Sequence, residues 1–290
     1  MNYELKNSEL TVSISDVGAE LKSVRSRDGF EYVCNGNVGE WKYRAPLLFP
    51  ICGRLKNARY TLNGKEYDMG IHGFARDNRF DVRERSNTEI VFTLTENEST
   101  LAAYPFSFRL TVTYSLSGRA LSLKVRVENS GSRVLPYMFG WHPGFALSPK
   151  LYVDDYCLDM GIDRVDRLES RENGDGTFTR YADSIALPGG CYKLSEESLM
   201  SYETTIFQST ARHVTLKTDK DNHALRLSWS DNLRYLCVWK WPLAEAKFLC
   251  LEPWTELPTV ESLTDDFGVK KMTRMEVGGS EEYCYLAEFI

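Results

Sequence analysis

Residues 108–128 read FRLTVTYSLSGRALSLKVRVE, and this stretch decides the class of fold. Apolar residues take every second position on both sides of Ser117-Gly118, first from Phe108 to Leu116 and then from Leu121 to Val127. A period of two describes β-strands that bury one face. A Ser-Gly pair between two such runs indicates a tight turn. The stretch therefore predicts an antiparallel β-hairpin.

The same alternation recurs along the chain, and helical signals are scarce. Period-two runs lie at residues 10–14, at 214–216 and 225–229 on either side of a polar turn, and at 283–289. Residues 195–200 read as one short turn of helix behind a capping serine. There is no alternation of strands with helices, no glycine-rich phosphate loop and no internal repeat. Many strands with few helices predict an all-β sandwich or barrel.

The chain shows no sign of a division into domains. No Pro- or Gly-rich linker interrupts it, so we expect one domain spanning residues 1–290. Residues 169–177, which contain Gly174 and Gly176, form the most loop-like segment and are predicted to be a long surface connection. A hydrophobic content of 42% over 290 residues is sufficient for a large core.

Composition excludes several classes of function. A net charge of −6 argues against a general nucleic-acid binder, which needs basic patches to neutralise phosphates. No apolar run approaches the length of a membrane span, and residues 1–6 lack the layout of a signal peptide. The seven cysteines are widely spaced without a CxxC pair, which is typical of buried free thiols in a reducing compartment. We expect a cytoplasmic protein that binds neither nucleic acid nor a membrane.

Two of the four histidines lie in segments built from glycine, proline and aromatic residues. His72 lies in GIHGFAR at 70–76, and His142 lies in GWHPGF at 140–145. Glycine and proline indicate loops or strand ends, from which a rigid sheet can present a side chain to a pocket. Trp141 and the phenylalanines of both segments would supply the flat apolar surface that a sugar site needs.

A glutamate and an arginine end two apolar runs. Glu252 follows four apolar residues in FLCLEPW at 248–254, and Arg54 ends the run FPICGRL at 49–55. A buried carboxylate is costly unless it is paired or functional, and burial raises its pKa toward the value that suits a general base. An arginine in this position can donate several hydrogen bonds to ligand hydroxyls.

Each of these signals also has a structural interpretation. The two histidines could be structural residues in turns, the glutamate could face solvent at a strand end, and the arginine could form a surface ion pair. The other two histidines, His213 and His223, lie in or near a polar hairpin and are predicted to be surface residues.

Taken in order along the chain, the motifs resemble the aldose 1-epimerase (galactose mutarotase-like) superfamily, and most closely its LacX-like branch. The order is Gly53-Arg54 with LNGKEY at 62–67, then His72-Gly73, then WHPGF at 141–145, then CLEPW at 250–254. The resemblance covers nearly the whole chain. It implies the fold of that family, a large twisted antiparallel β-sandwich with the sugar in an open cleft on one sheet.

The resemblance also implies roles for individual residues. Glu252 matches the general base of the family, and His142 matches the general acid, which we expect a nearby acid to keep protonated. His72 and Arg54 match residues that hold the sugar near its reacting end. Glu203 stands by position where the family has a substrate-binding aspartate. The implied activity is interconversion of the α and β anomers of an aldose by ring opening and closure.

This reaction calls for no cofactor. It has no redox step, so neither nicotinamide nor flavin is needed, and none is signalled. His72 and His142 are far apart in sequence without a local ligand pair, so we predict that the protein binds no metal. The expected partner is a small-molecule sugar. The preferred aldose and the oligomeric state are left open by the sequence.

Three other functions remain open. An epimerase for hexose 6-phosphates would need a cationic pocket, for which Arg76, with Lys56 or Arg79, is the candidate; Arg76 could instead pair with Asp77. A catalytically silent carbohydrate-binding protein could use the same fold, although it needs no matched acid and base. A glycosidase would need two carboxylates, and we find one well-placed carboxylate motif.

Overall fold

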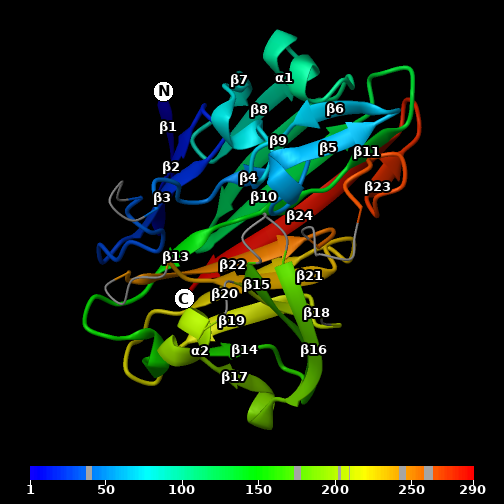
Figure 1. The fold of residues 1–290 in the computed structure, drawn as a ribbon. Coiled ribbons are helices and arrows are strands. Elements are labelled where there is room, and N and C mark those ends of the chain that lie inside the picture. Colours follow the sequence, from blue (N-terminus) through cyan, green and yellow to red (C-terminus); the bar gives the residue numbers. More distant parts are fainter. Residues whose placement is uncertain (37–40, 173–177, 202–203, 209, 242–245, 258–263) are drawn as a thin grey trace.

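The computed structural model of the protein consists mostly of β-strands (Figure 1), and it describes residues 1–36, 41–172, 178–201, 204–208, 210–241, 246–257 and 264–290. The described helices are short, namely α1 (Glu98–Ala103), α2 (Glu196–Ser201) and the single 3-10 turns η1 (Lys56–Ala58), η2 (Ala75–Asp77), η3 (Val153–Asp155) and η4 (Pro188–Gly190). Within the described ranges no helix has the length and apolar character needed to cross a membrane. The prediction of an all-β fold is confirmed.

Two large sheets make up the body of the molecule, and their strands pair antiparallel. The nine-stranded sheet runs in the order β17 (Cys191–Lys193), β14 (Cys157–Asp159), β19 (His213–Lys217), β20 (Leu225–Trp229), β24 (Ser280–Phe289), β10 (Ala120–Glu128), β9 (Arg109–Ser117), β8 (Glu89–Thr95) and β7 (Asp81–Arg85). The predicted hairpin of residues 108–128 forms β9 and β10 at its centre, paired from Ser117 with Ala120 to Arg109 with Glu128.

The eight-stranded sheet carries Trp141 and Glu252 of the residues singled out in the sequence, and His142 directly follows one of its strands. Its order is β16 (Phe178–Ala186), β15 (Arg164–Glu172), β18 (Thr204–Gln208), β21 (Tyr235–Trp239), β22 (Phe248–Trp254), β12 (Gly140–Trp141) and β4 (Leu47–Leu48), with β13 (Gly144–Ala146) also paired to β22. Smaller sheets flank the two large ones, formed by β1 (Asn2–Lys6), β2 (Leu10–Ser15) and β3 (Leu21–Ser26), by β5 (Arg59–Leu62) and β6 (Lys65–Asp68), and by β11 (Leu135–Tyr137) and β23 (Thr273–Met275).

The core lies between the two large sheets. Trp141 of β12 packs against Tyr285 of β24 with ring centroids 5.3 Å apart, and Phe139 stacks on Tyr283 at 4.8 Å. All four side chains are at most 1% exposed. Because alternate residues of a strand project to opposite faces, one face of the eight-stranded sheet is committed to this core. The opposite face is the one left to form a site.

The prediction of a surface connection at residues 169–177 was wrong for its first four residues. Residues 169–172 belong to β15, which pairs with β16 from Arg164 with Ala186 to Glu172 with Phe178, whereas residues 173–177 lie outside the described part of the chain. As far as Glu172 on one side and Phe178 on the other, the described chain therefore forms two long paired strands. Their polar composition hides the strand pattern, because β16 is the end strand of the sheet and a sheet edge does not demand apolar alternation.

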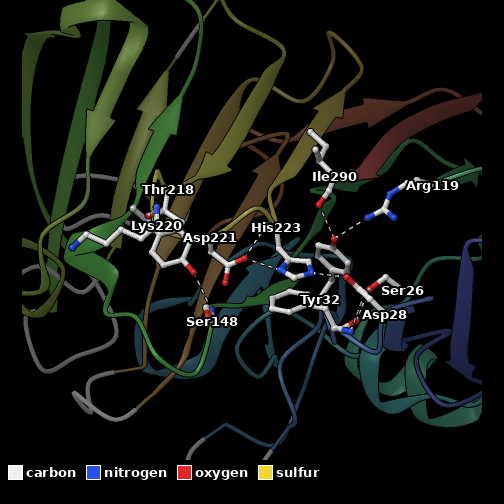
Figure 2. A network of polar contacts seen from close by, with 12 residues as sticks. Ser26, Asp28, Tyr32, Arg119, Ser148, Thr218, Lys220, Asp221, His223 and Ile290 are labelled. Carbon is white, nitrogen blue, oxygen red and sulfur yellow. Dashed lines mark hydrogen bonds and ion pairs between the residues drawn. The ribbon is translucent and has the colours of Figure 1, made fainter.

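His223 is half-buried between two aspartates and is not a free surface residue (Figure 2). Its Nδ1 lies 2.6 Å from Asp221 Oδ1, and its Nε2 lies 3.0 Å from Asp28 Oδ2. Its ring stacks on Phe30 at 4.0 Å. Nearby, the Tyr32 hydroxyl donates to the carbonyl oxygen of Ile290 at 2.7 Å. This network joins the turn after β3 to the β19–β20 turn and to Ile290. These segments are far apart in the sequence, so no local pattern predicts the contacts between them.

Candidate active site

Glu252 lies on β22, on the face of the eight-stranded sheet that points away from the core. Pairing places Gly140 opposite Trp254, so Trp254 and Glu252, two residues apart, share a face opposite to that of Trp141. Cys237 of β21 lies directly opposite Glu252. The carboxyl-bearing residue is 1% exposed. The sequence thus places an acidic side chain at a buried position on the sheet, with a buried thiol beside it; we call the surroundings of Glu252 the pocket.

His142 reaches the same pocket from the end of β12. Its Nε2 lies 3.2 Å from Glu252 Oε2, and its own side chain is 8% exposed. Two residues before His142, Gly140 leaves room for the Trp254 ring, since a Cβ at that position would lie 2.5 Å from Trp254 Cδ1. The contact lacks hydrogen-bond geometry: among the described residues, neither Glu252 Oε2 nor His142 Nδ1 has a hydrogen-bond partner. Buried polar atoms without partners are rare in native proteins, and here they point to a ligand.

His72 completes a cluster of three. Its ring stands perpendicular to that of His142, with centroids 5.2 Å apart. His72 has a φ of 64° and Gly73 a φ of 71°, and a Cβ on residue 73 would lie 2.3 Å from the carbonyl oxygen of Phe49. Only glycine fits there, which explains the His-Gly pair in the sequence. The Gly53 backbone N–H donates to His72 Nδ1 at 3.0 Å, so the proton of the neutral ring is on Nε2.

Burial drives the Glu252–His142 pair toward its neutral forms. It raises the pKa of the Glu252 carboxyl well above its usual value, with the Trp254 indole acting in the opposite direction. It also lowers the pKa of His142 to about 3, and the positive charge of Arg76 contributes to this fall. The sequence led us to expect a protonated His142. Burial instead favours the neutral ring in the site without ligand.

Two arginines lie near His72. Burial is the main cause that lowers the pKa of His72 well below its usual value, and the charges of Arg76 and Arg54 add to it. Arg54 is exposed. The Arg76 guanidinium lies 4.4 Å from the centre of the Tyr43 ring, with Nε 3.5 Å from Asp77 Oδ2. The ion pair that the sequence left open is therefore present, yet Arg76 Nε is buried without a hydrogen-bond partner among the described residues.

Tryptophans that the sequence analysis missed form the aromatic walls. The ring of Trp41 lies 4.8 Å from that of His142, and the ring of Trp239 lies 5.6 Å from it. Both tryptophans are half-buried, and Trp41 also stacks on Phe248 at 5.5 Å. A signal for Trp239 was present, because β21 pairs with β22 and Trp239 lies two residues from the position opposite Glu252. Trp41 carried no such signal.

Trp141, by contrast, does not line the pocket. It is 1% exposed, and its indole N–H donates to the carbonyl oxygen of Ala45 at 3.0 Å in the core. The physical reason is the alternation of strand residues: with His142 on the pocket side, its neighbour Trp141 must face the other way. The prediction that Trp141 contacts the sugar is therefore corrected, and the residue supports the site from behind.

The fourth predicted binding residue, Glu203, lies outside the described part of the chain. The described helix α2 ends two residues before it and is held to the end of β21 by an ion pair of 3.0 Å between Lys240 Nζ and Glu196 Oε1. The substrate-binding role of Glu203 stays a prediction.

One thiol shares the pocket with the acid–base pair. Among the described residues, His142, Cys250 and Glu252 form one group of three potential metal ligands, with ligand atoms within 4.8 Å of one another. All three are buried. The residue types are compatible with a soft divalent ion, so the predicted absence of a metal stays a prediction.

Comparisons with known proteins agree with this geometry. The aldose 1-epimerase family matches residues 1–270. The plasmid-encoded protein LacX of Lactococcus lactis subsp. lactis is 30% identical over 284 residues, which cover 89% of each chain. A galactose mutarotase related enzyme from Lactobacillus acidophilus has 28% identity and a TM-score of 0.92, with 100% of this chain and 97% of that chain covered. A galactose mutarotase-like protein from Lactobacillus casei has 30% identity and a TM-score of 0.89, with both chains fully covered. The resemblance seen in the sequence motifs is confirmed.

Proposed function

The chain belongs to the aldose 1-epimerase family, and from this we propose that it interconverts the α and β anomers of an aldose by general acid–base catalysis at Glu252 and His142. One observation carries the proposal: a buried carboxyl and a buried imidazole lie 3.2 Å apart, each has a buried polar atom without a hydrogen-bond partner among the described residues, and the Trp41 ring packs beside them. Anomerisation needs one group that removes a proton from the C1 hydroxyl and another that protonates the ring oxygen.

The proposed steps conserve protons. Glu252 accepts the proton of the C1 hydroxyl while His142 donates one to the ring oxygen. The bond between C1 and the ring oxygen breaks and leaves an open-chain aldehyde. After rotation about C1–C2, the ring closes on the other face of the aldehyde and both protons return. No group other than the two side chains has to carry a proton.

The protonation state of the free site fits this cycle without a change of pH. Burial favours a protonated Glu252 and a neutral His142, so the pair holds one proton. The active form, an ionised Glu252 beside a protonated His142, holds the same single proton. Its formation requires a transfer across the 3.2 Å contact, which sugar hydroxyl groups assist by supplying the hydrogen bonds that burial removed.

His72 supports the proposal as a donor to substrate. With Nδ1 occupied by the Gly53 N–H, the neutral ring carries its proton on Nε2. Its position beside His142 suits it to hold a sugar oxygen near the reacting carbon. Arg54, exposed and close enough to lower the pKa of His72, is suited to bind a neighbouring hydroxyl.

A phosphorylated aldose is the second candidate substrate, and the arginines favour it. Arg54 and Arg76 both act electrostatically on His72, and Arg76 Nε is buried without a hydrogen-bond partner among the described residues. Two guanidinium groups beside a sugar site match the charge and shape of a phosphate. If this is the substrate, Arg76→Ala should reduce kcat/KM for glucose 6-phosphate far more than for glucose.

Polarimetry of freshly dissolved α-anomers tests the proposal. The protein is added to a panel of free and 6-phosphorylated aldoses, and the uncatalysed rate is subtracted. We expect a catalysed approach to anomeric equilibrium for at least one member. Binding of an aldose, measured by calorimetry, without acceleration for any member would contradict the proposal and identify a silent carbohydrate-binding protein.

A further inference from the structure

Two cysteines meet at one end of the nine-stranded sheet. Cys157 of β14 and Cys191 of β17 have their Sγ atoms 3.2 Å apart, in S–H···S contact. The two strands pair with Cys157 opposite Lys193 and Asp159 opposite Cys191, so the cysteines are diagonal neighbours on one face. β17 is the end strand of the sheet. The contact therefore links the last strand of the sheet to the strand beside it.

Exposure distinguishes this pair from the other thiols. Four cysteines of the chain, Cys34, Cys52, Cys237 and Cys250, are at most 4% exposed. Cys157 and Cys191 are both half-buried, so a small reagent can reach them. Cys284 is also half-buried and is the natural control. Cys157 and Cys191 combine a sulfur–sulfur contact with partial exposure, which are the two conditions for selective thiol oxidation.

We propose that Cys157 and Cys191 are a modification site, a dithiol that a small hydroperoxide converts reversibly to an intramolecular disulfide. One thiolate attacks the peroxide, whose O–O bond breaks, and becomes a sulfenic acid with release of the first water. The second thiol then displaces the hydroxyl of the sulfenic acid as the second water, and the Sγ–Sγ bond forms. Two thiols are oxidised, and one hydrogen peroxide is reduced to two waters. A thiol reductant reverses the change.

The bond requires the two strands to draw together locally, because diagonal neighbours in a sheet usually lie about 7–8 Å apart, near the upper limit of the Cα separation that a disulfide spans. A disulfide has an S–S length of about 2 Å, so the sulfur atoms must approach by about 1 Å from their present contact. The ammonium group of Lys217, 2.5 Å from Asp159 Oδ2, lies close enough to Cys157 to favour the ionised form of that thiol. Burial nevertheless raises the pKa of Cys157 to about 11, with the neighbouring Cys191 contributing. We therefore expect slow oxidation at neutral pH that accelerates as pH rises.

The bond would close a defined part of the fold. Cys157 and Cys191 are 34 positions apart, and between them the chain leaves the nine-stranded sheet, forms β15 and β16 at the end of the eight-stranded sheet, and returns. Figure 1 shows β14 and β17 side by side. Cross-linking a loop of this size restricts the unfolded chain. The oxidised protein should melt about 5 °C higher than the reduced one.

The test oxidises the intact, fully reduced protein with increasing hydrogen peroxide, blocks the remaining thiols with N-ethylmaleimide and identifies linked peptides by mass spectrometry. We expect an intact mass lower by two hydrogens, a single Cys157–Cys191 linked peptide, and reversal by dithiothreitol. Cys284→Ser should behave like the wild type. Cys157→Ser and Cys191→Ser should form no internal disulfide and show no rise in Tm on oxidation. None of these measurements depends on the proposed epimerase activity.

A trivalent organoarsenical provides a second measurement, because it bridges two adjacent thiols without requiring oxidation. One equivalent should bind to the wild type and to Cys284→Ser, and none to Cys157→Ser. Three results would overturn the proposal: sulfinic acid at these cysteines without a link, a disulfide that involves another cysteine or a second chain, or arsenical binding that survives Cys157→Ser.

Discussion

The chain contains two histidine–carboxylate groupings that have similar distances and opposite electrostatics. His142 Nε2 lies 3.2 Å from Glu252 Oε2, where the side chains are 8% and 1% exposed. His223 Nε2 lies 3.0 Å from Asp28 Oδ2, where they are 26% and 61% exposed. Burial lowers the pKa of His142 and raises that of Glu252. Around His223 the outcome is the reverse: partial burial is outweighed by the bonds with Asp28 and Asp221, so its pKa is raised.

The difference shows that access to solvent, more than the contact distance, decides the protonation state of a histidine–carboxylate pair. In the His223 grouping water remains available, the charged forms of histidine and carboxylate are favoured, and the ion pairs stabilise the structure. In the His142 pair water is excluded, the charged forms are unfavourable, and the polar atoms are left for a ligand. The first arrangement is typical of a structural contact, and the second is typical of a catalytic acid and base.

The largest expected effect is on turnover. Glu252→Gln keeps the shape of the side chain and removes the base, so the catalysed rate should fall by about 10²–10⁴-fold, and His142→Asn should act similarly. His223→Ala is the matched control and should keep its activity. Polarimetry gives the rates, and calorimetry shows whether sugar binding survives. A folded Glu252→Gln protein with near-normal turnover would falsify the mechanism, whereas joint loss of binding and turnover would indicate a structural glutamate.

A smaller effect is expected at the edge of the pocket. Arg54→Ala removes a charged hydrogen-bond donor that we propose binds the sugar without entering the chemistry. KM should rise about tenfold, and kcat should change little. Steady-state polarimetry at several sugar concentrations separates the two constants. A fall in kcat with an unchanged KM would assign Arg54 to the transition state and contradict its placement as a binding residue.

Stability, and not turnover, should respond to His223. Its raised pKa means that its contribution is complete below the unfolded value of 6.5 and is lost as pH rises through the folded pKa. His223→Ala should lower the free energy of unfolding by about 1 kcal/mol at pH 5.5 and by less at pH 8.5. Urea denaturation at both pH values measures this. An equal loss at both would show that stacking on Phe30, and not charge, is what His223 contributes.

The smallest effect is expected from Asp28→Asn. Hydrogen bonds from Ser26 and His223 lower the pKa of Asp28, so its contribution is present above the unfolded value of 3.8 and is lost as pH falls. The side chain is exposed, and Asp221 still faces His223 in the variant. Urea denaturation at pH 5.5 should show a smaller loss than His223→Ala. A loss larger than that of His223→Ala would mean that the turn at Asp28 depends on Ser26 and not on the histidine.

Much of the fold could be predicted from the sequence because period-two alternation marks strands with one buried face. The runs that became β9, β10, β19, β20 and β24 are of this kind. β15 and β16 escaped because they form the end of a sheet and carry polar residues on a pattern that resembles a loop. The contact of His223 with Asp28 spans 195 positions and has no local signature.

At the site, the sequence located the polar residues better than their surroundings. His72 and His142 lie in motifs that contain close-packed glycines, since a Cβ at Gly73 would meet the Phe49 carbonyl and a Cβ at Gly140 would meet Trp254. The prediction that Trp141 contacts the sugar failed because consecutive residues of a strand point to opposite faces, and His142 takes the face of the site. The charge of His142 could not be predicted either, since it depends on how completely the folded pocket excludes water.

A titration of the four histidines by imidazole ¹⁵N NMR tests the central claim most directly, which is that the candidate site is dry and its histidine neutral. The signals of His142 and His223 are assigned by their absence in His142→Asn and His223→Ala. The account predicts that His142 in the free protein stays neutral from pH 9 down to pH 5, consistent with a pKa of about 3, and that His223 is still largely charged at pH 6.5. A His142 signal that titrates at or above 6.5 would contradict the account, because it would mean that the pocket holds a charged imidazole before any sugar arrives.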